Sequence, residues 1–283
     1  MKSVVVTGVS TGIGRATAQV LTRKGFHVFG SLRKPADMDA LRTDLGQNFT
    51  PFLFDVTDEE SVSRAAQIVR EQLGGHTLAG LVNNAGIALA GPLLHQPMEE
   101  VRQQMEVNVI GPLTVTRKFA SLLGTDRSLQ GDPGRIVNIG SASGRIGAPF
   151  VGAYAASKHA LEGLSESLRR ELLLYGIDVI LIGPGPVVTP MWDKAEASDV
   201  TAYAKTDYSQ VLPIFRDYAI QHGRRGFPPE RVANVVWKAL TVKNPRVRYA
   251  VVPQRFLNWT LPMALPRRFV DKLIGRRLGL LRK

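Results

Sequence analysis

Short runs of β-branched and other apolar residues alternate with longer amphipathic segments along most of the chain. The runs are typical of buried strands and predict strands at 4–6, 27–32, 51–54, 78–82, 135–139, 178–182 and 248–252. The segments between them repeat apolar residues near the helical period and predict helices at 14–24, 61–73, 99–123, 153–175 and 229–240. This alternation predicts an α/β fold, a Rossmann-type doubly wound parallel sheet of about seven strands with right-handed crossovers.

The length of 283 residues suits a single α/β domain, since no Pro/Gly/Ser linker or low-complexity tract divides the chain. The absence of cysteine excludes disulfides, thiolate zinc sites and cysteine nucleophiles. It also fits a reducing compartment, so a cytoplasmic location is expected. The five histidines are scattered without ligand spacing, and no metal site is predicted. No run reaches the roughly 18 apolar residues of a membrane span.

The positive charge is concentrated at the C-terminal end. Residues 246–283 contain ten Lys/Arg against the single Asp271, a balance of +9 within a total of +12. The first 245 residues are therefore nearly neutral, which argues against specific nucleic-acid binding. We expect residues 1–253 to form the domain and residues 254–283 to form a basic, amphipathic C-terminal extension.

A glycine-rich turn stands between the first predicted strand and the first predicted helix, in the order Thr7-Gly8-Val9-Ser10-Thr11-Gly12-Ile13-Gly14. Glycines permit a tight turn and let backbone N–H groups approach a phosphate at the positive end of the helix. The context predicts a dinucleotide pyrophosphate site, with a plain strand-to-helix connection as the alternative.

The end of the second predicted strand bears on the choice of cofactor. An NAD-selective site places a carboxylate about 20 residues beyond the glycine motif. Here the strand ends Gly30-Ser31-Leu32-Arg33-Lys34, with no acid before Asp37. Arg33 can bond a 2′-phosphate in bidentate fashion, so NADP(H) is favoured and NAD(H) stays open. The alternative is a solvated basic residue at a helix start.

Three side chains could form a proton relay. Tyr154 and Lys158 are four residues apart, so on a helix they share one face, and Ser141 precedes Tyr154 by 13 residues. A free phenol has a pKa near 10, and a neighbouring cation stabilises its anion. The spacing therefore predicts a tyrosine acid/base, with an exposed helical pair as the alternative.

Taken in order, these motifs resemble those of the short-chain dehydrogenase/reductase family over nearly the whole chain. The family's T-G-x-x-x-G-x-G turn is matched at Thr7, Gly8, Gly12 and Gly14, and its later motifs are matched at Asp55, Asn83-Asn84-Ala85-Gly86, Asn108, Ser141, Tyr154, Lys158, Pro184-Gly185 and Thr189. The residues at 32–33, 91–93 and 160–168 resemble those of the family branch that contains 17β-hydroxysteroid and retinol dehydrogenases.

The resemblance implies an enzyme that moves a hydride between a nicotinamide and a carbonyl carbon. Tyr154 would be the acid/base, Lys158 would lower its pKa and bond the nicotinamide ribose, Ser141 would donate to the substrate oxygen, and Asn108 would hold a water. Asp55 would meet the adenine amine, Asn83 the adenosine side and Thr189 the carboxamide. The implied cofactor contacts are Thr7, Gly8, Ser10, Gly12, Ile13, Gly14, Arg33, Asp55, Val56, Asn83, Ala85, Gly86, Tyr154, Lys158, Pro184, Gly185, Val187 and Thr189.

In the family, the segment at about 189–228 closes over the substrate as a helical lid. Here it contains Trp192, Tyr203, Tyr208, Phe215, Tyr218 and Phe227, six aromatics in 39 residues. Such a lid suits a bulky lipophilic, steroid- or retinoid-like carbonyl or alcohol, with packing of the lid onto the body as the alternative. A smaller carbonyl, a 3-oxoacyl substrate and a non-enzymatic dinucleotide-binding regulator are the other hypotheses.

Two further expectations concern partners. The long helices at 99–123 and 153–175 resemble the pair through which family members form homodimers or homotetramers. The extension from residue 254 mixes apolar residues, among them Phe256, Leu257, Trp259 and Phe269, with the basic cluster. Such a segment could lie peripherally on an anionic membrane or could pack over the pocket with its charges in water.

Overall fold

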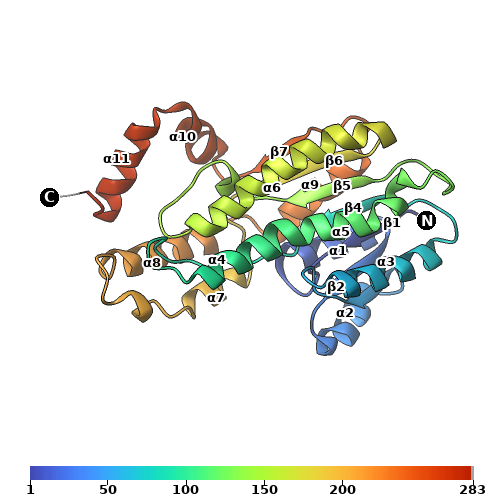
Figure 1. Cartoon of the computed structure of the whole chain (residues 1–283), viewed down its shortest axis with the longest axis horizontal. Helices are drawn as coiled ribbons and strands as arrows, with labels where there is room; N and C mark the ends of the chain where they lie inside the picture. The colour runs from blue at the N-terminus through green and yellow to red at the C-terminus, as the bar shows by residue number, and fades with distance from the viewer. Residues whose placement is uncertain (282–283) are drawn as a thin grey trace.

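The computed structural model describes residues 1–281, which contain one sheet of seven parallel strands (Figure 1). The spatial order is β3-β2-β1-β4-β5-β6-β7, which reverses direction between β1 and β4. The strands are β1 (Ser3–Val6), β2 (His27–Leu32), β3 (Phe49–Leu53), β4 (Gly80–Asn83), β5 (Arg135–Ile139), β6 (Asp178–Pro184) and β7 (Arg248–Val251). The predicted fold class, a doubly wound parallel sheet, is confirmed.

Helices cover both faces of the sheet because successive residues of each buried strand point to opposite sides. Val4 and Val6 of β1 join one core with residues of three helices, and Val5 joins the other core. The first core lies under α1 (Gly12–Arg23), α2 (Met38–Leu45) and α9 (Pro229–Thr241). The second lies under α3 (Glu59–Leu73), α5 (Gly111–Phe119) and the carboxyl-terminal part of α6 (Gly152–Glu171).

The predicted helix at 99–123 is one helical run in four pieces. It consists of α4 (Met98–Met105), a π-helical turn at Glu106–Ile110, α5 and a last turn at Ser121–Thr125, in which Gly124 has a non-helical φ of 119°. Pro112 lies in the first turn of α5 and has no N–H to donate to the helical ladder, so a change of helical pitch just before it is less costly. The first π-helical turn contains Asn108, one of the predicted site residues.

After β6 the chain leaves the sheet and forms two helices before it returns as α9. These are α7 (Met191–Glu196) and α8 (Val211–Arg224), and a bridge between Val187 and Phe227 closes the base of the excursion. Inside it, Tyr203 and Leu212 are buried against Phe150, with Tyr208 and Phe215 packed around them. The aromatic residues of this segment therefore form a small core of their own.

The chain ends in two helices, α10 (Leu261–Ala264) and α11 (Arg267–Leu278), preceded by a π-helical turn at Phe256–Thr260. In Figure 1 they lie at the end of the molecule that also carries α7 and α8. Leu280 packs on the Phe150 cluster, and the Arg248 guanidinium lies 4.5 Å from the centre of the buried Trp259 ring. Within residues 1–281, no helix is both long and apolar enough to span a bilayer.

Candidate active site

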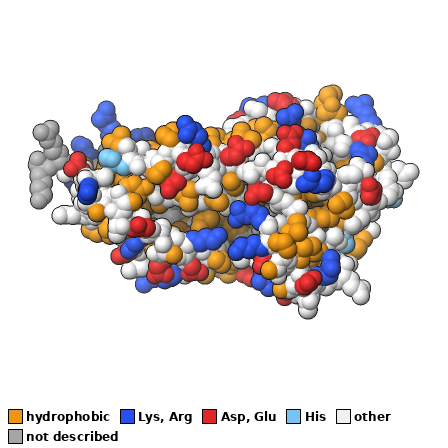
Figure 2. Space-filling view, turned by 60° about the horizontal axis from the view of Figure 1, so that its bottom comes forward, with side chains coloured by type: hydrophobic (Ala, Val, Ile, Leu, Met, Phe, Trp, Pro, Cys, Tyr) orange, Lys and Arg blue, Asp and Glu red, His pale blue; other side chains and the backbone are white. Residues whose placement is uncertain are grey.

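The carboxyl ends of β1, β4, β5 and β6 meet at one edge of the sheet, where the strand order reverses. In open α/β sheets this switch point forms a crevice outside the strand ends. The space-filling view shows such a hollow between the end with α7 and α8 and the end with α1 and α2 (Figure 2). Lys and Arg side chains gather along it, with hydrophobic side chains behind them.

The glycine-rich turn is shaped by contacts that only glycine allows. Gly8 and Gly12 adopt positive φ values of 71° and 59°. A Cβ at Gly14 would lie 2.1 Å from the carbonyl oxygen of Gly8, so any side chain there would push the helix away from the turn. The backbone of the turn is thereby kept free of side chains where a phosphate would approach.

The Thr7 side chain holds this turn from within. Its buried Oγ1 accepts hydrogen bonds from the N–H groups of Asn84 and Ala85, both at 2.9 Å. The Asn84 amide donates to the carbonyls of Thr7 at 2.8 Å and of Gly8 at 3.1 Å. Ser31 Oγ accepts from the Gly8 N–H at 3.0 Å. Asn84 and Ser31 are thus structural residues of the turn; the sequence analysis included Asn84 only as part of the family motif and gave Ser31 no role.

The amino terminus of α1 fits a dinucleotide phosphate. Thr11, the residue before the helix, accepts no side-chain capping bond from within residues 1–281, and the first turn contains no acid. The backbone N–H groups of Ser10, Gly12 and Ile13 are therefore available to bind an anion. The positive end of the helix dipole stabilises an anion at this position. A Cβ at Gly12 would lie 3.2 Å from Thr189 Cγ2, so Thr189 stands beside the turn.

Arg33 and Asp55 lie together where β2 and β3 end. Arg33 Nη1 is 3.7 Å from Asp55 Oδ2, and 66% of the Arg33 side chain is exposed. The other Asp55 oxygen accepts from the N–H and the hydroxyl of Thr57 at 3.0 and 2.8 Å. Val56 is buried against Gly111. An exposed ion pair of this kind is weak, so Arg33 can turn to a phosphate at small cost.

The Asn83 side chain is bonded within the fold, and the contact of Asn83 with the adenosine side stays a prediction. Asn83 is still part of β4, and its buried amide donates to Thr116 Oγ1 at 3.1 Å and to Asn138 Oδ1 at 2.8 Å. The side chain therefore points into the sheet and its covering helix, not toward the hollow. The reason is the pleat of the strand, which turns neighbouring residues to opposite sides.

Lys158 and Tyr154 lie on α6, as their spacing predicts. Lys158 Nζ is 5.8 Å from the centre of the Tyr154 ring and donates to the Ile139 carbonyl at the end of β5 at 2.9 Å. The lysine is buried, and burial lowers its pKa to about 8, because the charged form loses water. A Cβ at Gly86 would lie 3.7 Å from this ammonium, so Gly86 keeps space open beside it.

The pKa of the Tyr154 phenol is shifted in the direction opposite to the one expected from the sequence. Burial raises its pKa above the ordinary value of 10, and a hydrogen bond with the Ser141 side chain lowers it only in part. Desolvation therefore sets the direction of the shift, and at neutral pH the phenol is protonated. Ser141 itself begins a short turn at Ala142–Gly144, where its Oγ accepts from the Ser143 N–H at 3.0 Å. A protonated phenol is the form that can donate to a carbonyl oxygen.

Asn108 connects the helical run of α4 and α5 to the site. Its Oδ1 accepts from the Ile87 N–H at 2.9 Å, and its Nδ2 donates to the Ile87 carbonyl at 2.9 Å and to Ser157 Oγ at 3.0 Å. Ser157 in turn donates to the Tyr154 carbonyl at 2.7 Å. The π-helical turn lets Asn108 reach both partners, and π-helical turns are frequent at functional sites. The water implied for Asn108 stays a prediction.

Glu162 is a neighbour of the site that sequence reasoning missed. It lies one turn beyond Lys158 on α6, its side chain is 9% exposed, and it pairs with Arg145 at 2.9 Å and with Arg248 at 2.8 Å. Arg145 follows the Ser141 turn, and Arg248 begins β7. Glu162 therefore fixes the turn that carries Ser141, and its partners are too far away in the sequence for any spacing rule to find.

The loop after β6 contributes the last predicted site residues at the carboxyl edge of the sheet. The Gly185 N–H donates to the Val251 carbonyl at 2.9 Å, which extends the pairing of β6 with β7 beyond Pro184. Val187 is buried, and its carbonyl accepts from Trp192 Nε1 at 2.8 Å. These bonds fix the stretch that leads to Thr189.

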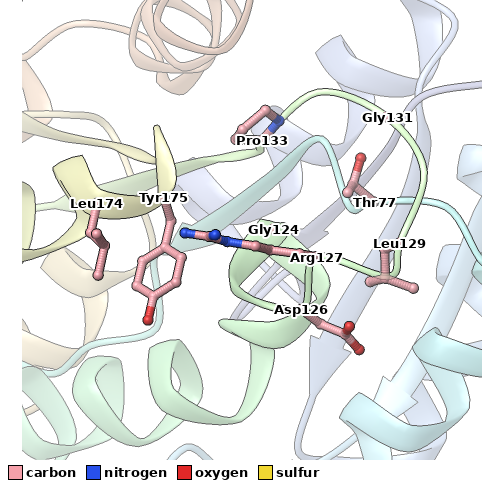
Figure 3. A pocket seen from close by; sticks show the side chains of 9 residues that line it. All are labelled: Thr77, Gly124, Asp126, Arg127, Leu129, Gly131, Pro133, Leu174 and Tyr175. Carbon is pink, nitrogen blue, oxygen red and sulfur yellow. The ribbon is translucent and has the colours of Figure 1, made fainter.

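A second hollow lies at the opposite edge of the sheet and has a volume of about 260 Å³ (Figure 3). Its lining includes Thr77, Pro133 and Tyr175, which precede β4, β5 and β6 respectively. The predicted site residues all lie toward the carboxyl ends of the strands. This hollow is therefore not the candidate active site.

Comparison with known proteins defines the class. Residues 2–199 match the short chain dehydrogenase family. The chain is 38% identical over 278 residues to the NADPH-dependent 3-dehydrocapnine reductase of Ornithobacterium rhinotracheale, with 98% of each chain covered. It is 32% identical to mouse retinol dehydrogenase 5, covering 96% of this chain and 87% of that protein. A short-chain dehydrogenase structure from Streptomyces avermitilis superposes with a TM-score of 0.76 at 26% identity, covering 98% and 97%.

The chain therefore belongs to the short-chain dehydrogenase/reductase family. Like the family as a whole, it is an NAD(P)-dependent oxidoreductase. The resemblance stated from the sequence motifs is confirmed.

Proposed function

We propose that the protein interconverts a bulky lipophilic ketone or aldehyde and its alcohol with NADP(H). The observation that carries the proposal is the grouping of Tyr154, Lys158 and Ser141 at the switch point, with the phenol held protonated. A bound nicotinamide supplies the hydride. Tyr154 then donates its proton to the carbonyl oxygen as negative charge develops there, and Ser141 donates a second hydrogen bond to the same oxygen. Alcohol oxidation is the reverse path.

Lys158 would act on this step through its charge and through the cofactor. Its ammonium favours the phenolate that remains after proton transfer, and it can bond the nicotinamide ribose. Thr189 would orient the carboxamide. The N–H groups of Ser10, Gly12, Ile13 and Gly14 would hold the pyrophosphate, while the Gly8 N–H is taken by Ser31 and Gly8 shapes the turn. The remaining walls would be shaped by Val56, Ala85, Gly86, Pro184, Gly185 and Val187.

Selectivity for NADP(H) rests on Arg33. It is an exposed guanidinium at the end of β2, and the acid that would hold a ribose diol is missing from this strand end. Its neighbour Asp55 would be left to the adenine. The relative from Ornithobacterium rhinotracheale is named as NADPH-dependent, which supports the same choice here.

A lipophilic substrate is supported by the apolar residues next to Thr189, where the lid segment begins. Val188 and Met191 are close to Thr189 in the sequence and have exposed side chains, and the same segment contributes Tyr203 and Leu212 to the buried Phe150 cluster. Apolar walls with few polar groups suit a ligand that is itself largely apolar. Retinol dehydrogenase 5 is named for a lipophilic alcohol.

One observation favours the second candidate, a smaller carbonyl or 3-oxoacyl substrate. Phe150 packs edge-on against Tyr208 and Phe215, with ring centres 5.6 and 5.3 Å apart. The Trp192 ring is likewise occupied by contacts within the lid, because it lies against Gly223 and donates a hydrogen bond to the Val187 carbonyl. Aromatic surface that is buried in contacts within the lid cannot contact the substrate, so less apolar surface remains for a bulky ligand.

We also propose a homodimer or homotetramer, in the cytoplasm, assembled through the α4–α5 run and α6. On α6 the small residues Ala156, Gly163 and Ser167 are exposed, and a Cβ at Gly163 would meet nothing within 4 Å. A flat face of small residues lets a second helix approach closely.

The test follows nicotinamide absorbance with NADPH and with NADH across steroid, retinoid and short-chain carbonyls of matched reactivity. The proposal expects turnover with NADPH and a kcat/KM that rises with apolar bulk. A kcat/KM highest for short carbonyls would select the second candidate. No turnover with any carbonyl and either cofactor would contradict the reaction itself.

A further inference from the structure

The C-terminal extension exposes apolar side chains on consecutive helical segments. Phe256 is 65% exposed and Phe269 50%, and four further large apolar side chains of the segment are between 37% and 56% exposed. Together they form what we call the tail face: Phe256, Leu257, Leu261, Met263, Phe269 and Leu273. So many large exposed apolar side chains within 18 residues are unusual for a free surface of a monomer and indicate a binding surface.

The extension does not need these side chains to hold its place. Trp259 and Leu278 are buried, and the Arg277 guanidinium lies 4.5 Å from the centre of the Tyr218 ring on α8. Leu280 packs on the Phe150 cluster. On α11, Phe269 and Leu273 lie one turn apart and roughly opposite to Leu278. The helix is therefore attached by one side, and the tail face is on another.

Cations accompany the tail face. They are Arg255, Arg267, Arg268, Lys272 and Arg276, and Asp271 is the only acid of the segment. On α11, Lys272 and Arg276 flank Phe269 and Leu273 at helical spacing. An apolar stripe bordered by Lys and Arg is complementary to an anionic lipid surface, where apolar side chains enter the acyl boundary and cations meet the headgroups. A second copy of the tail would instead bring like charges together.

We propose that the tail face seats the protein peripherally on anionic membranes. Because α11 packs on α8, the C-terminal extension that carries this face lies beside the lid, which itself exposes Ile214 and Tyr218. The lid would then open next to the lipid, and a lipophilic carbonyl could reach the candidate site without crossing water. This last step rests on the proposed function, whereas binding to lipid does not.

The experiment is vesicle flotation of the full chain with pure phosphatidylcholine and with phosphatidylcholine mixed with phosphatidylglycerol in equal parts. The wild type should float with the anionic vesicles and remain below with the neutral ones, and salt should release it. The double variants Phe269→Ser/Leu273→Ser and Lys272→Glu/Arg276→Glu should each reduce the partition coefficient at least about tenfold. The matched control Leu173→Ser/Leu174→Ser, at positions 71% and 69% exposed before β6, should float as the wild type does.

Equal flotation of the wild type with neutral vesicles, or unchanged flotation of both tail variants, would overturn the proposal. So would a fall in solution mass of the tail variants by light scattering with no loss of flotation, since the face would then bind a second copy. Tyr154→Phe should float normally, which separates lipid binding from the proposed reaction. Turnover of a water-soluble carbonyl by both tail variants should match the wild type and shows that they are folded.

Discussion

At the scale of single residues, burial shifts the two central titrating groups in opposite senses. It raises the pKa of Tyr154 and lowers that of Lys158 to about 8. Each shift favours the neutral form, as removal of water does for any ionisable group. At pH 7 the phenol therefore carries its proton and the amine still carries its charge, which is the pair of states that carbonyl reduction needs.

This pair of states predicts a pH dependence. As the pH rises through about 8, Lys158 loses its charge and the stabilisation of the phenolate with it. The kcat/KM for reduction should fall about tenfold per pH unit above that value. The measurement is the kcat/KM profile from pH 6 to 10 at saturating NADPH; a profile flat to pH 10 would contradict the role of the lysine charge.

The same shift makes Lys158 costly for stability at neutral pH. The folded-state pKa lies below the unfolded value of 10.5, so the unfolded chain binds more protons between pH 8 and 10.5, and stability rises with pH in that window. Lys158→Met removes a penalty of about 3 kcal/mol at pH 7 and gives up one hydrogen bond of about 1 kcal/mol. Urea unfolding should show the variant about 2 kcal/mol more stable at pH 7, with the difference vanishing near pH 10. A less stable variant at pH 7 would contradict this account.

Arg33 supplies a prediction about the cofactor. If it bonds the 2′-phosphate, Arg33→Ala removes charge-assisted hydrogen bonds of about 1.5–3 kcal/mol, so the Kd for NADPH should rise about 10- to 100-fold. The Kd for NADH should change by less than about threefold, because the Arg33–Asp55 pair is exposed and weak. Fluorescence titration with each dinucleotide measures both values. Equal losses for the two would refute the assignment.

At the scale of elements, the strands were the most predictable part and the helix irregularities the least. The strands at 27–32 and 135–139 begin and end where the apolar runs do. The π-helical turn at Glu106–Ile110 could not be predicted, because it depends on bonds from Asn108 to Ile87 and Ser157, which lie 21 and 49 residues away. Helix α2 and the helices of the C-terminal extension were likewise absent from the prediction, and α7 and α8 were expected only as a helical lid without bounds of their own.

The candidate site likewise has features that the sequence could predict and features that it could not. The Tyr154–Lys158 face follows from local helical geometry, so spacing alone could predict it. The hydrogen-bond partners of Asn83 and Asn84 depend on the residue at which β4 ends, which sequence patterns locate least well. The pKa of Tyr154 depends on burial, and burial is a property of the packed molecule.

Two glycines offer a matched test at this scale. Gly14→Ala would place a Cβ 2.1 Å from the Gly8 carbonyl, so the turn and α1 must separate, and cofactor affinity should fall at least about tenfold. Within one chain, Gly163→Ala on α6 meets nothing within 4 Å, so it should leave the NADPH affinity unchanged and serves as the control. Isothermal titration with NADPH and thermal unfolding of both variants give the comparison. Normal NADPH affinity in Gly14→Ala would contradict the close approach.

At the scale of the whole molecule, one side chain connects segments from distant parts of the chain. Glu162 on α6 pairs with Arg145 beyond the Ser141 turn and with Arg248 on β7, and Arg248 lies against Trp259 of the C-terminal extension. The active-site turn, the last strand and the extension thus share one ionic cluster. This arrangement explains why the extension has a fixed place beside the lid.

The central claim at this scale is that the fold brings Tyr154 to a bound nicotinamide as the proton donor. The most direct measurement compares Tyr154→Phe with the wild type, using NADPH titration and NADPH oxidation by a carbonyl that the wild type reduces. The phenyl ring keeps the packing and removes only the hydroxyl. We predict an NADPH Kd within about twofold of the wild type and a turnover reduced about 100-fold or more. Retention of more than about a tenth of the wild-type turnover would contradict the account.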